Sequence, residues 1–343
     1  MKRAVLFLAL AAAALFTVAA TTPKGLESGA FDWRLPAGVA PPPVPADNPM
    51  SAAKVELGRR LFYEADLSID GTMSCATCHE QKRGFTDSNR TRPGVHGDPG
   101  RRNIMTLAGV GYFRTLTWAD RRETGLERQV RVPLFGQTPV EMGMAGQEAE
   151  LARRLSQDAC YRQMFRDAFP EADGRIDVET VSKALAAFQR TLLAFDTPYD
   201  RGVMSAQARA GERLFRSRRL GCAGCHAGPH FTDAATSDDA YHRLPGAASA
   251  DRGLAESTGR DADTGRFRTP GLRNVAASAP YLHDGSAATL PDAIARHYAP
   301  GDRAAPSPAD TARLGAFLEA LTDEGFLRDP RHALPRTACG RPL

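Results

Sequence analysis

Apolar side chains recur through much of the chain at the three- and four-residue spacing that places them on one face of a helix. The pattern begins after Ser51, a residue suited to cap a helix, where Ala53, Leu57 and Leu61 share a face. Further helices are expected over residues 151–155, 165–169, 181–192, 289–298 and 307–321. Strand signals are few, so the hydrophobic pattern predicts a mainly α protein.

Two long stretches lack this periodicity. Residues 86–146 are irregular and rich in glycine, and residues 228–291 are irregular as well. Long stretches without regular structure usually carry function in compact domains. Residues 196–205, with Pro198 and Gly202 as breakers, are typical of a boundary between two helical modules.

Two short motifs carry the strongest chemical signal. Residues 75–79 read CATCH and residues 222–226 read CAGCH, so each motif has two thiols followed directly by an imidazole. The cysteines of such a motif bind the two vinyl groups of a porphyrin, and its histidine reaches the iron from one face. We therefore expect two covalently bound haems of c type, held by Cys75, Cys78, His79, Cys222, Cys225 and His226.

The residues before the two motifs also resemble each other. Residues 58–62 read GRRLF and residues 211–215 read GERLF, which indicates duplication of one haem module. The sequence thus predicts a mainly α protein with two cytochrome c-like haem domains and long irregular loops. The N-terminal domain is expected over residues 51–200, and the C-terminal domain, with a C-terminal extension, over residues 201–343.

Composition narrows the class of protein further. The 343 residues are 42% hydrophobic and 24% charged, as in ordinary globular proteins, and the net charge is only +4. No basic run is interleaved with aromatic residues, so nucleic acid is not an expected partner.

The N-terminal residues predict secretion. Residues 1–20 have the layout of a cleavable signal peptide, and no later stretch is long and apolar, so we expect a periplasmic protein without a membrane span. Residues 21–50 are rich in proline and are expected to form an extended arm on the surface. Cys160 and Cys339 remain after the haem pairs; an oxidising compartment permits a disulfide between them, and two separate buried thiols are an equal alternative.

Each iron also needs an assignment for the position opposite its motif histidine. A closed iron transfers electrons, whereas an open one can bind peroxide or oxygen. All eight methionines lie at or before Met204, so none follows the second motif. Candidate ligands after it include His230, His242, His283, His297 and Tyr298, and the pattern alone does not choose among them.

Three stretches of the C-terminal half resemble a known family. They are FRTPGLRNV over residues 267–275, APYLHDG over residues 279–285, and the pair Thr289-Leu290. They are similar to the C-terminal signature of bacterial dihaem cytochrome c peroxidases and the related MauG enzymes, and the resemblance extends from Asn48 to Phe326. Residues 133–143, which include PLFG and PVEMG, are most similar to the MbnH-like members associated with methanobactin.

The resemblance implies roles for individual residues. Tyr298 stands where MauG-like proteins have a tyrosine and the peroxidases a methionine, so it is implied as the sixth ligand of the second haem. The first haem is implied to be open and peroxide-reactive, with Glu141 as proton shuttle, Gln129 orienting the peroxide and Pro133 in the same site. Gln137 is the alternative to Gln129, because the spacing from Gln129 to Glu141 is two residues longer than in MauG.

The resemblance also implies groups between the haems. Trp118 matches the tryptophan whose indole would carry oxidising equivalents from one iron to the other. One calcium ion is implied, with the Asn103 side chain and the carbonyls of Ser278 and Pro280 as ligands. His96 lies near the place of a histidine that caps the resting iron in the peroxidases; we expect a loop residue there, with a ligand switch as the alternative.

These roles lead to an expected function. Hydrogen peroxide would react at the His79 haem, and the second oxidising equivalent would pass through Trp118 to the haem held by His226 and Tyr298. Both irons would reach a high-valent state that oxidises a side chain, expected to be tryptophan, of a secreted partner protein. The alternatives are a dihaem cytochrome c peroxidase that takes electrons from a small cytochrome, and a non-catalytic dihaem electron carrier.

Overall fold

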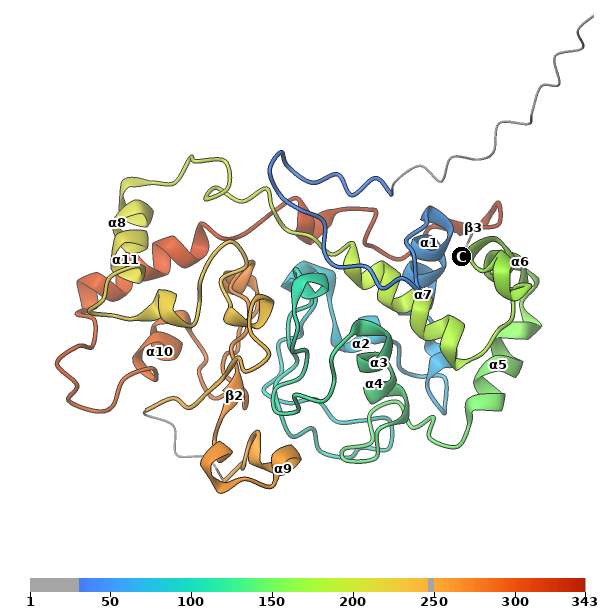
Figure 1. The fold of residues 1–343 in the computed structure, drawn as a ribbon, viewed down its shortest axis with the longest axis horizontal. Helices are drawn as coiled ribbons and strands as arrows, with labels where there is room; N and C mark the ends of the chain where they lie inside the picture. Colours follow the sequence, from blue (N-terminus) through green and yellow to red (C-terminus); the bar gives the residue numbers. More distant parts are fainter. Residues whose placement is uncertain (1–30, 246–249, 343) are drawn as a thin grey trace, which may run out of the picture. The chain divides into compact units, whose positions relative to one another are not determined.

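Helices supply most of the regular structure in the part of the chain that the computed structural model describes, residues 31–245 and 250–342 (Figure 1). The strands of these residues form two antiparallel pairs, β1 with β2 and β3 with β4. The prediction of a mainly α protein is confirmed. The expected signal peptide and residues 21–30 of the expected arm lie outside the described residues. Within the described residues, every helix is too short or too polar to cross a membrane.

The α-helices are α1 (Ala52–Phe62), α2 (Cys75–Cys78), α3 (Leu126–Gln129), α4 (Arg131–Phe135), α5 (Glu148–Gln157), α6 (Ala159–Ala168), α7 (Val178–Arg190), α8 (Ala206–Phe215), α9 (Ala255–Thr258), α10 (Leu290–Ala295) and α11 (Pro308–Glu319). The strands are β1 (Tyr241–His242), β2 (Phe267–Arg268), β3 (Thr337–Ala338) and β4 (Arg341–Pro342). Short 3-10 turns join them, among them η5 (Cys222–Gly224) and η9 (Phe326–Arg328).

The expected helix starts are confirmed at the atomic level. The side chains of Ser51, Thr289 and Ser307 each accept a hydrogen bond from the backbone N–H three residues later, which caps α1, α10 and α11. Helix α10 ends at Ala295, earlier than expected, because the backbone N–H groups of His297 and Tyr298 each donate to a carbonyl three residues earlier, as in a 3-10 turn. The stretch expected to be irregular contains α3 and α4, which are too short to produce a periodic signal.

One helix pair occurs twice. Helix α1 packs against α7, and α8 packs in the same way against α11 (Figure 1). A Cβ atom on Gly58 of α1 would lie 1.9 Å from the carbonyl oxygen of Ala184, and one on Gly211 of α8 would lie 1.9 Å from that of Arg313. Only glycine permits this close contact, so the repeated GRRLF and GERLF segments encode one packing geometry.

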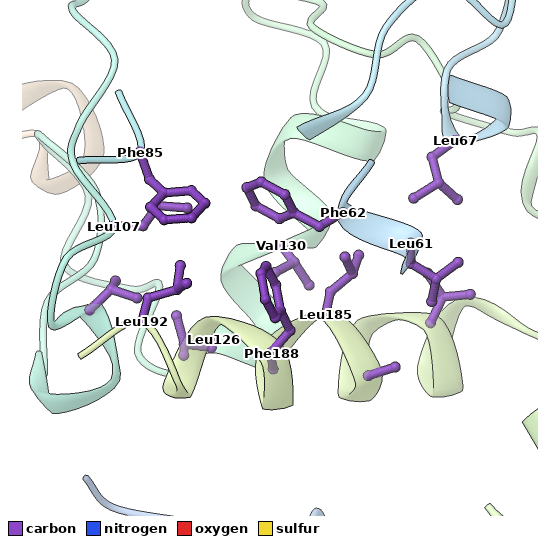
Figure 2. Packing of buried hydrophobic residues seen from close by; sticks show 14 of the residues in the cluster. Leu61, Phe62, Leu67, Phe85, Leu107, Leu126, Val130, Leu185, Phe188 and Leu192 are labelled. Atoms are coloured by element: carbon purple, nitrogen blue, oxygen red, sulfur yellow. The ribbon is translucent and has the colours of Figure 1, made fainter. Parts of the chain in front are cut away.

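The aromatic contacts inside the two pairs correspond as well. The ring centroids of Phe62 and Phe188 lie 5.3 Å apart, and those of Phe215 and Phe317 lie 5.1 Å apart. Figure 2 shows the first of these pairs inside a core that includes Phe85 and leucines of α1 and α7. The repeat in sequence is therefore a repeat in structure.

Residues 325–342 return to the N-terminal helices. Nε2 of Gln81 donates to the carbonyl oxygens of Phe326 (3.0 Å) and Asp329 (2.9 Å), and the Tyr63 hydroxyl donates to that of His332 at 2.8 Å. Phe326 belongs to the first core and not to the core around α8 and α11. The C-terminal extension thus packs on the module at the opposite end of the chain.

A covalent bond fixes this extension. Cys160 of α6 and Cys339, between β3 and β4, form a disulfide. Of the two alternatives that the sequence left open, the bridge is the one observed. The division of the chain at residue 200 stays a prediction.

Candidate functional site

Each CXXCH motif forms a tight helical turn, α2 in the first and η5 in the second, and its histidine follows the turn. Nδ1 of His79 lies 2.7 Å from the carbonyl oxygen of Phe85, and Nδ1 of His226 lies 3.0 Å from that of Phe231. A hydrogen bond at Nδ1 fixes the ring and leaves Nε2 free for a metal. Both motifs therefore fit a haem iron.

An uncommon backbone conformation orients the carbonyls of Phe85 and Phe231 toward the two histidines. The φ angles of Phe85 and Phe231 are 62° and 54°, in a region that residues other than glycine rarely adopt. Both phenyl rings are completely buried, so core packing stabilises the turn. Burial also lowers the pKa of His79, and it lowers the pKa of His226 to about 4, so both imidazoles are neutral at pH 7 and can bind iron.

A cavity of ≈ 560 Å³ lies against the second motif. Its lining is mostly apolar and includes the motif residues Cys222, Cys225 and His226 together with Trp118. Cofactor sites in proteins commonly have volumes of about 300–1,000 Å³. The residues present thus fit a porphyrin attached through the two cysteines.

The two residues after α10 that can bind iron, His297 and Tyr298, both line this cavity. The ring centroid of His297 lies 6.3 Å from that of His226. The Tyr298 hydroxyl donates to the carbonyl oxygen of Leu220 at 3.0 Å, and burial, with a smaller effect of Cys222, raises its pKa to about 12. The structure brings the expected ligand Tyr298 to the cavity, with its hydroxyl bonded to the segment that precedes the motif.

Backbone hydrogen bonds hold the segment that carries Glu141. The N–H of Val95 donates to the carbonyl of Glu141 at 2.7 Å, and the N–H of Met142 donates to that of Pro133 at 3.0 Å. The carbonyl of Met142 in turn accepts from the N–H of Ile69 at 2.9 Å. The segment is therefore fixed by three separate parts of the N-terminal half.

An ion pair anchors the neighbouring helix α3 to α7. Both carboxylate oxygens of Glu127 accept from the guanidinium of Arg190, at 2.7 Å and 2.9 Å, and Arg190 is 3% exposed. The Asn48 amide adds a third donor to the same carboxylate at 2.7 Å. A bidentate pair of this kind has a defined geometry, so α3 and the residues after it are held rigidly.

Glu141 lies close to the first motif. Burial raises the pKa of the Cys75 and Cys78 thiols, and the negative charge of Glu141 adds a smaller effect to both, so its carboxyl lies within electrostatic range of the motif. The side chain is half-buried, and burial raises the pKa of Glu141 above its usual range. Gln129 ends α3 and is half-buried, whereas Gln137 lies exposed in the turn after α4.

Residues 103–118 connect the surroundings of the two motifs. The backbone of Met105 lies next to the His79 ring, and two residues earlier the carbonyl of Asn103 accepts from Nε1 of Trp118 at 2.7 Å. Trp118 also lines the cavity of the second motif. Trp118 thus joins the second cavity, through its bond to Asn103, to the segment that passes the His79 ring.

Arg268 is a buried cation that the sequence analysis did not single out. It lines the second cavity, is 2% exposed, and donates to the carbonyl of Thr115 at 3.2 Å and to the sulfur of Met105 at 2.9 Å. Its Nε has no hydrogen-bond partner among the described residues. Burial lowers the pKa of Arg268 to about 10. The one sequence signal that pointed to Arg268 was its place in the segment FRTPGLRNV, which resembles the signature of the peroxidase family.

The expected calcium ligands come from two segments that meet. Asn103 is buried, its N–H donates to the carbonyl of His283 at 2.7 Å, and its amide nitrogen donates to the carbonyls of Asn89 and Arg90. The amide oxygen of Asn103 is therefore the atom left to bind a cation. His283 lies three residues beyond Pro280, so the structure brings the two expected ligand segments together.

The other histidines have separate environments. His96 is exposed on a turn, and its Nε2 would lie 3.3 Å from a Cβ atom on Gly143, next to the Glu141 segment. Nε2 of His242 lies 2.6 Å from the Asp233 carboxylate, whose hydrogen bond raises the pKa of His242 to about 10. The His230 ring packs at a tilt against the Tyr112 ring, and the His283 ring stacks on the Phe267 ring.

The two CXXCH turns, their oriented histidines and the cavity define a dihaem cytochrome of c type, and comparison with known proteins identifies its family. The family model for di-haem cytochrome c peroxidase matches residues 52–209. Cytochrome-c peroxidase IdrP1 from Denitromonas iodatirespirans is 33% identical over 92% of each chain, and MauG from Methylorubrum extorquens is 34% identical over 82% of each chain.

A solved structure agrees with these relatives. The crystal structure of a MauG-like protein associated with microbial copper homeostasis superposes with a TM-score of 0.83 and is 36% identical, covering 89% of this chain and 99% of that one. The chain belongs to the di-haem cytochrome c peroxidase and MauG family. It is accordingly a dihaem oxidoreductase, and the family implies two haems of c type.

Proposed function

We propose that this protein is a periplasmic, peroxide-dependent oxidase of the MauG and MbnH type, which uses hydrogen peroxide to oxidise a side chain, expected to be tryptophan, of a secreted partner protein. The observation that carries the proposal is Glu141, a half-buried carboxyl within electrostatic range of both thiols of the first motif. The 36% identity with a MauG-like protein supports the same assignment.

The reaction needs protons to be moved between the two oxygens of peroxide. When bound, haem c supplies the iron that exchanges electrons with the substrate. A carboxylate oxygen of Glu141 accepts the proton of the peroxide oxygen nearer the first haem and delivers it to the farther oxygen, which leaves as water. Burial raises the pKa of Glu141, so after the carboxylate has taken the first proton it holds that proton until the farther oxygen accepts it.

Neighbouring residues orient the reactants. The side-chain amide of Gln129 hydrogen-bonds the peroxide, and Gln137 takes this role if Gln129 does not reach it. Pro133 fixes the position of Glu141 through the bond from the N–H of Met142 to its carbonyl. These roles rest on the ion pair that anchors α3 to α7 and on the backbone hydrogen bonds that hold the Glu141 segment.

The indole of Trp118 carries the second oxidising equivalent from the first site to the second. Its contact with Asn103, close to Met105 and the His79 ring, and its place in the second cavity support this role. The partner protein then need not touch either iron, because aromatic residues can relay the oxidising equivalent outward.

A calcium ion holds the region between the haems. The Asn103 side-chain oxygen and the carbonyls of Ser278 and Pro280 are the proposed ligands. An all-oxygen set suits calcium, which binds carbonyl and amide oxygens at about 2.3–2.6 Å.

The proposed periplasmic location is supported by the disulfide between Cys160 and Cys339, because such bonds persist in oxidising compartments.

One experiment tests the function. Hydrogen peroxide is added to the fully ferric protein while the visible and near-infrared spectra are followed, and the product is then mixed with candidate secreted partners whose masses are measured. A long-lived oxidised form that appears without prior reduction, and that adds oxygen to a partner tryptophan, is the expected result. No spectral change would show an electron carrier and would refute the proposal.

A plain peroxidase is the second candidate, and one observation favours it. His96 lies on the turn whose Val95 N–H binds the carbonyl of Glu141, so a histidine is available near the first site. A peroxidase with this histidine as a leaving ligand would react with peroxide only after one haem has been reduced. The same titration, repeated with half-reduced protein and with a His96→Ala variant, separates the two functions.

A further inference from the structure

An edge-on aromatic ring packs beside the phenylalanine whose carbonyl orients the histidine of the second motif. The ring centroid of Tyr199 lies 5.3 Å from that of Phe231, and it lies 6.1 Å from that of Phe317 on α11. Tyr199 meets both phenyl rings edge to face, which is a favoured arrangement of aromatic side chains. Tyr199 belongs to the segment just before α8, so the second module supplies this ring itself.

In the first module a residue from the far end of the chain has this place. The His332 ring meets Phe85 and Phe188 edge to face, at centroid separations of 6.3 Å and 6.5 Å, and both phenylalanines belong to the core in Figure 2. They correspond to the two phenylalanines beside Tyr199, so His332 is the counterpart of that tyrosine. The segment before α1, residues 41–51, contains no aromatic residue that could supply the ring.

The C-terminal extension is bound firmly enough to hold this ring in place. The guanidinium of Arg59 donates to the carbonyls of Pro330 and Ala333, at 3.2 Å and 3.0 Å, on either side of His332. The disulfide at Cys339 ties the extension to α6 a few residues further on. His332 is therefore anchored from both directions along the chain.

His332 packs as a neutral ring. It is 7% exposed, and burial, with smaller effects of nearby charges and of the Thr191 backbone, lowers its pKa to about 4. Its Nδ1 has no hydrogen-bond partner among the described residues. The contacts that matter at this position are thus those of a flat ring and not those of a charge.

The contact with Phe85 connects this ring to the first motif. Phe85 has a φ of 62°, and its carbonyl oxygen lies 2.7 Å from Nδ1 of His79. A residue other than glycine keeps such a conformation only where its surroundings hold it. A hydrogen bond at Nδ1 also raises the basicity of a histidine that binds a metal. Loosening Phe85 would therefore change how strongly His79 donates to iron.

We propose that His332 is a positioning residue for the first haem, because its ring holds Phe85 and the Phe85 carbonyl in turn holds His79. The C-terminal extension thereby acts on the haem at the opposite end of the chain, in the place that Tyr199 has in the second module. The proposal concerns only the histidines of the two CXXCH motifs. It is independent of the peroxide chemistry proposed above, and either can fail without the other.

Removing the ring is expected to raise the reduction potential of the first haem. When the bond at Nδ1 weakens, His79 donates less charge and ferric iron is less favoured. Spectroelectrochemical titration of haem-loaded His332→Ala is expected to show a tenfold shift toward ferrous iron at one haem, about 59 mV. Amide hydrogen exchange, measured by mass spectrometry, is expected to become faster in residues 80–86, where the Phe85 N–H donates to the Glu80 carbonyl at 3.0 Å.

Three further variants separate positioning from a general loss of stability. His332→Phe keeps an aromatic ring and is expected to have the potentials and the exchange of the wild type. Leu334→Ala, at an exposed residue of the same extension, is expected to change neither. Tyr199→Ala is expected to shift the potential of the other haem, and to speed exchange in residues 227–232 instead.

Wild-type potentials and wild-type exchange of residues 80–86 in His332→Ala would overturn the proposal. A potential that moves as far in His332→Phe as in His332→Ala would overturn it as well, because the ring would then not be the cause. So would a shift of the same haem by His332→Ala and Tyr199→Ala. If His332→Ala does not fold, His332→Val, which leaves a smaller cavity, replaces it with the same expected directions.

Discussion

Replacing Glu141 by glutamine tests the proton shuttle with little change in side-chain shape. Glutamine keeps the size and hydrogen-bonding capacity of the side chain but cannot accept and return a proton. General acid–base catalysis by one positioned side chain contributes about 10²–10⁴-fold to a rate. The second-order rate constant for the reaction of peroxide with the first haem, measured by stopped-flow absorbance, is expected to fall by a factor in this range.

The pH profile gives an independent check. Glu141 must be ionised to take the first proton, and burial raises its pKa above the ordinary value of 4.5. The wild-type rate is therefore expected to decrease as pH falls through a pKa higher than 4.5, while the rate of Glu141→Gln stays low and flat.

Stability is expected to change in the opposite direction from activity. A carboxyl whose pKa is higher in the folded than in the unfolded state stabilises the protein fully below its unfolded pKa, and this contribution is lost as pH rises through the folded pKa. At pH 7 the variant should thus unfold at the same denaturant concentration as the wild type or a higher one. Glu148→Gln, an exposed change on the nearby helix α5, is the control. A Glu141→Gln rate constant within a few-fold of the wild type would refute the shuttle.

Three further predictions concern the surroundings of the sites. Trp118→Phe is expected to lose about 0.5–1.5 kcal/mol of stability with the indole hydrogen bond, and in stopped-flow traces the second haem should no longer respond to peroxide added at the first. Gly211→Ala should lower the free energy of unfolding, measured with denaturant, by about 1–3 kcal/mol or more, because its Cβ would meet the carbonyl oxygen of Arg313 at 1.9 Å. Gly315→Ala is the control, because a Cβ there has open space around it and should leave the free energy of unfolding unchanged. Arg268→Gln removes a buried positive charge from the second cavity, which favours ferric iron. Redox titration is expected to show the reduction potential of the second haem lowered by about 59 mV, a tenfold shift in the ratio of ferric to ferrous iron.

Local sequence signals predicted the parts of the fold that depend on local physics. The caps at Ser51, Thr289 and Ser307 were identifiable because the N-cap bond joins residues three apart. The haem motifs were identifiable for the same reason, since both thiols and the histidine lie within five consecutive residues. The Gly58 and Gly211 repeat predicted a duplicated module, although the close helix contact behind it became visible only in the structure.

The remaining features depend on contacts between distant residues. Neither Phe85 nor Phe231 is a residue type that signals a left-handed backbone, so the carbonyls that orient the motif histidines could not be predicted. The choice between a bridge and two thiols for Cys160 and Cys339 required the path of the C-terminal extension. The bond between the Tyr298 hydroxyl and the carbonyl of Leu220 could not be predicted from spacing, because it joins residues 78 apart in the chain.

The duplicated frame explains why the two haem sites can differ in chemistry. On the proximal side each module repeats one helix pair, one aromatic contact and one histidine–carbonyl bond, so both irons receive the same kind of ligand in the same orientation. What differs lies outside the repeated helices: backbone bonds hold the loop that carries Glu141 in the first module, and a short turn with His297 and Tyr298 follows α10 in the second. Because these segments are not part of the repeated helix pairs, the proposed open site and the proposed closed site can differ without a change in the fold that they share.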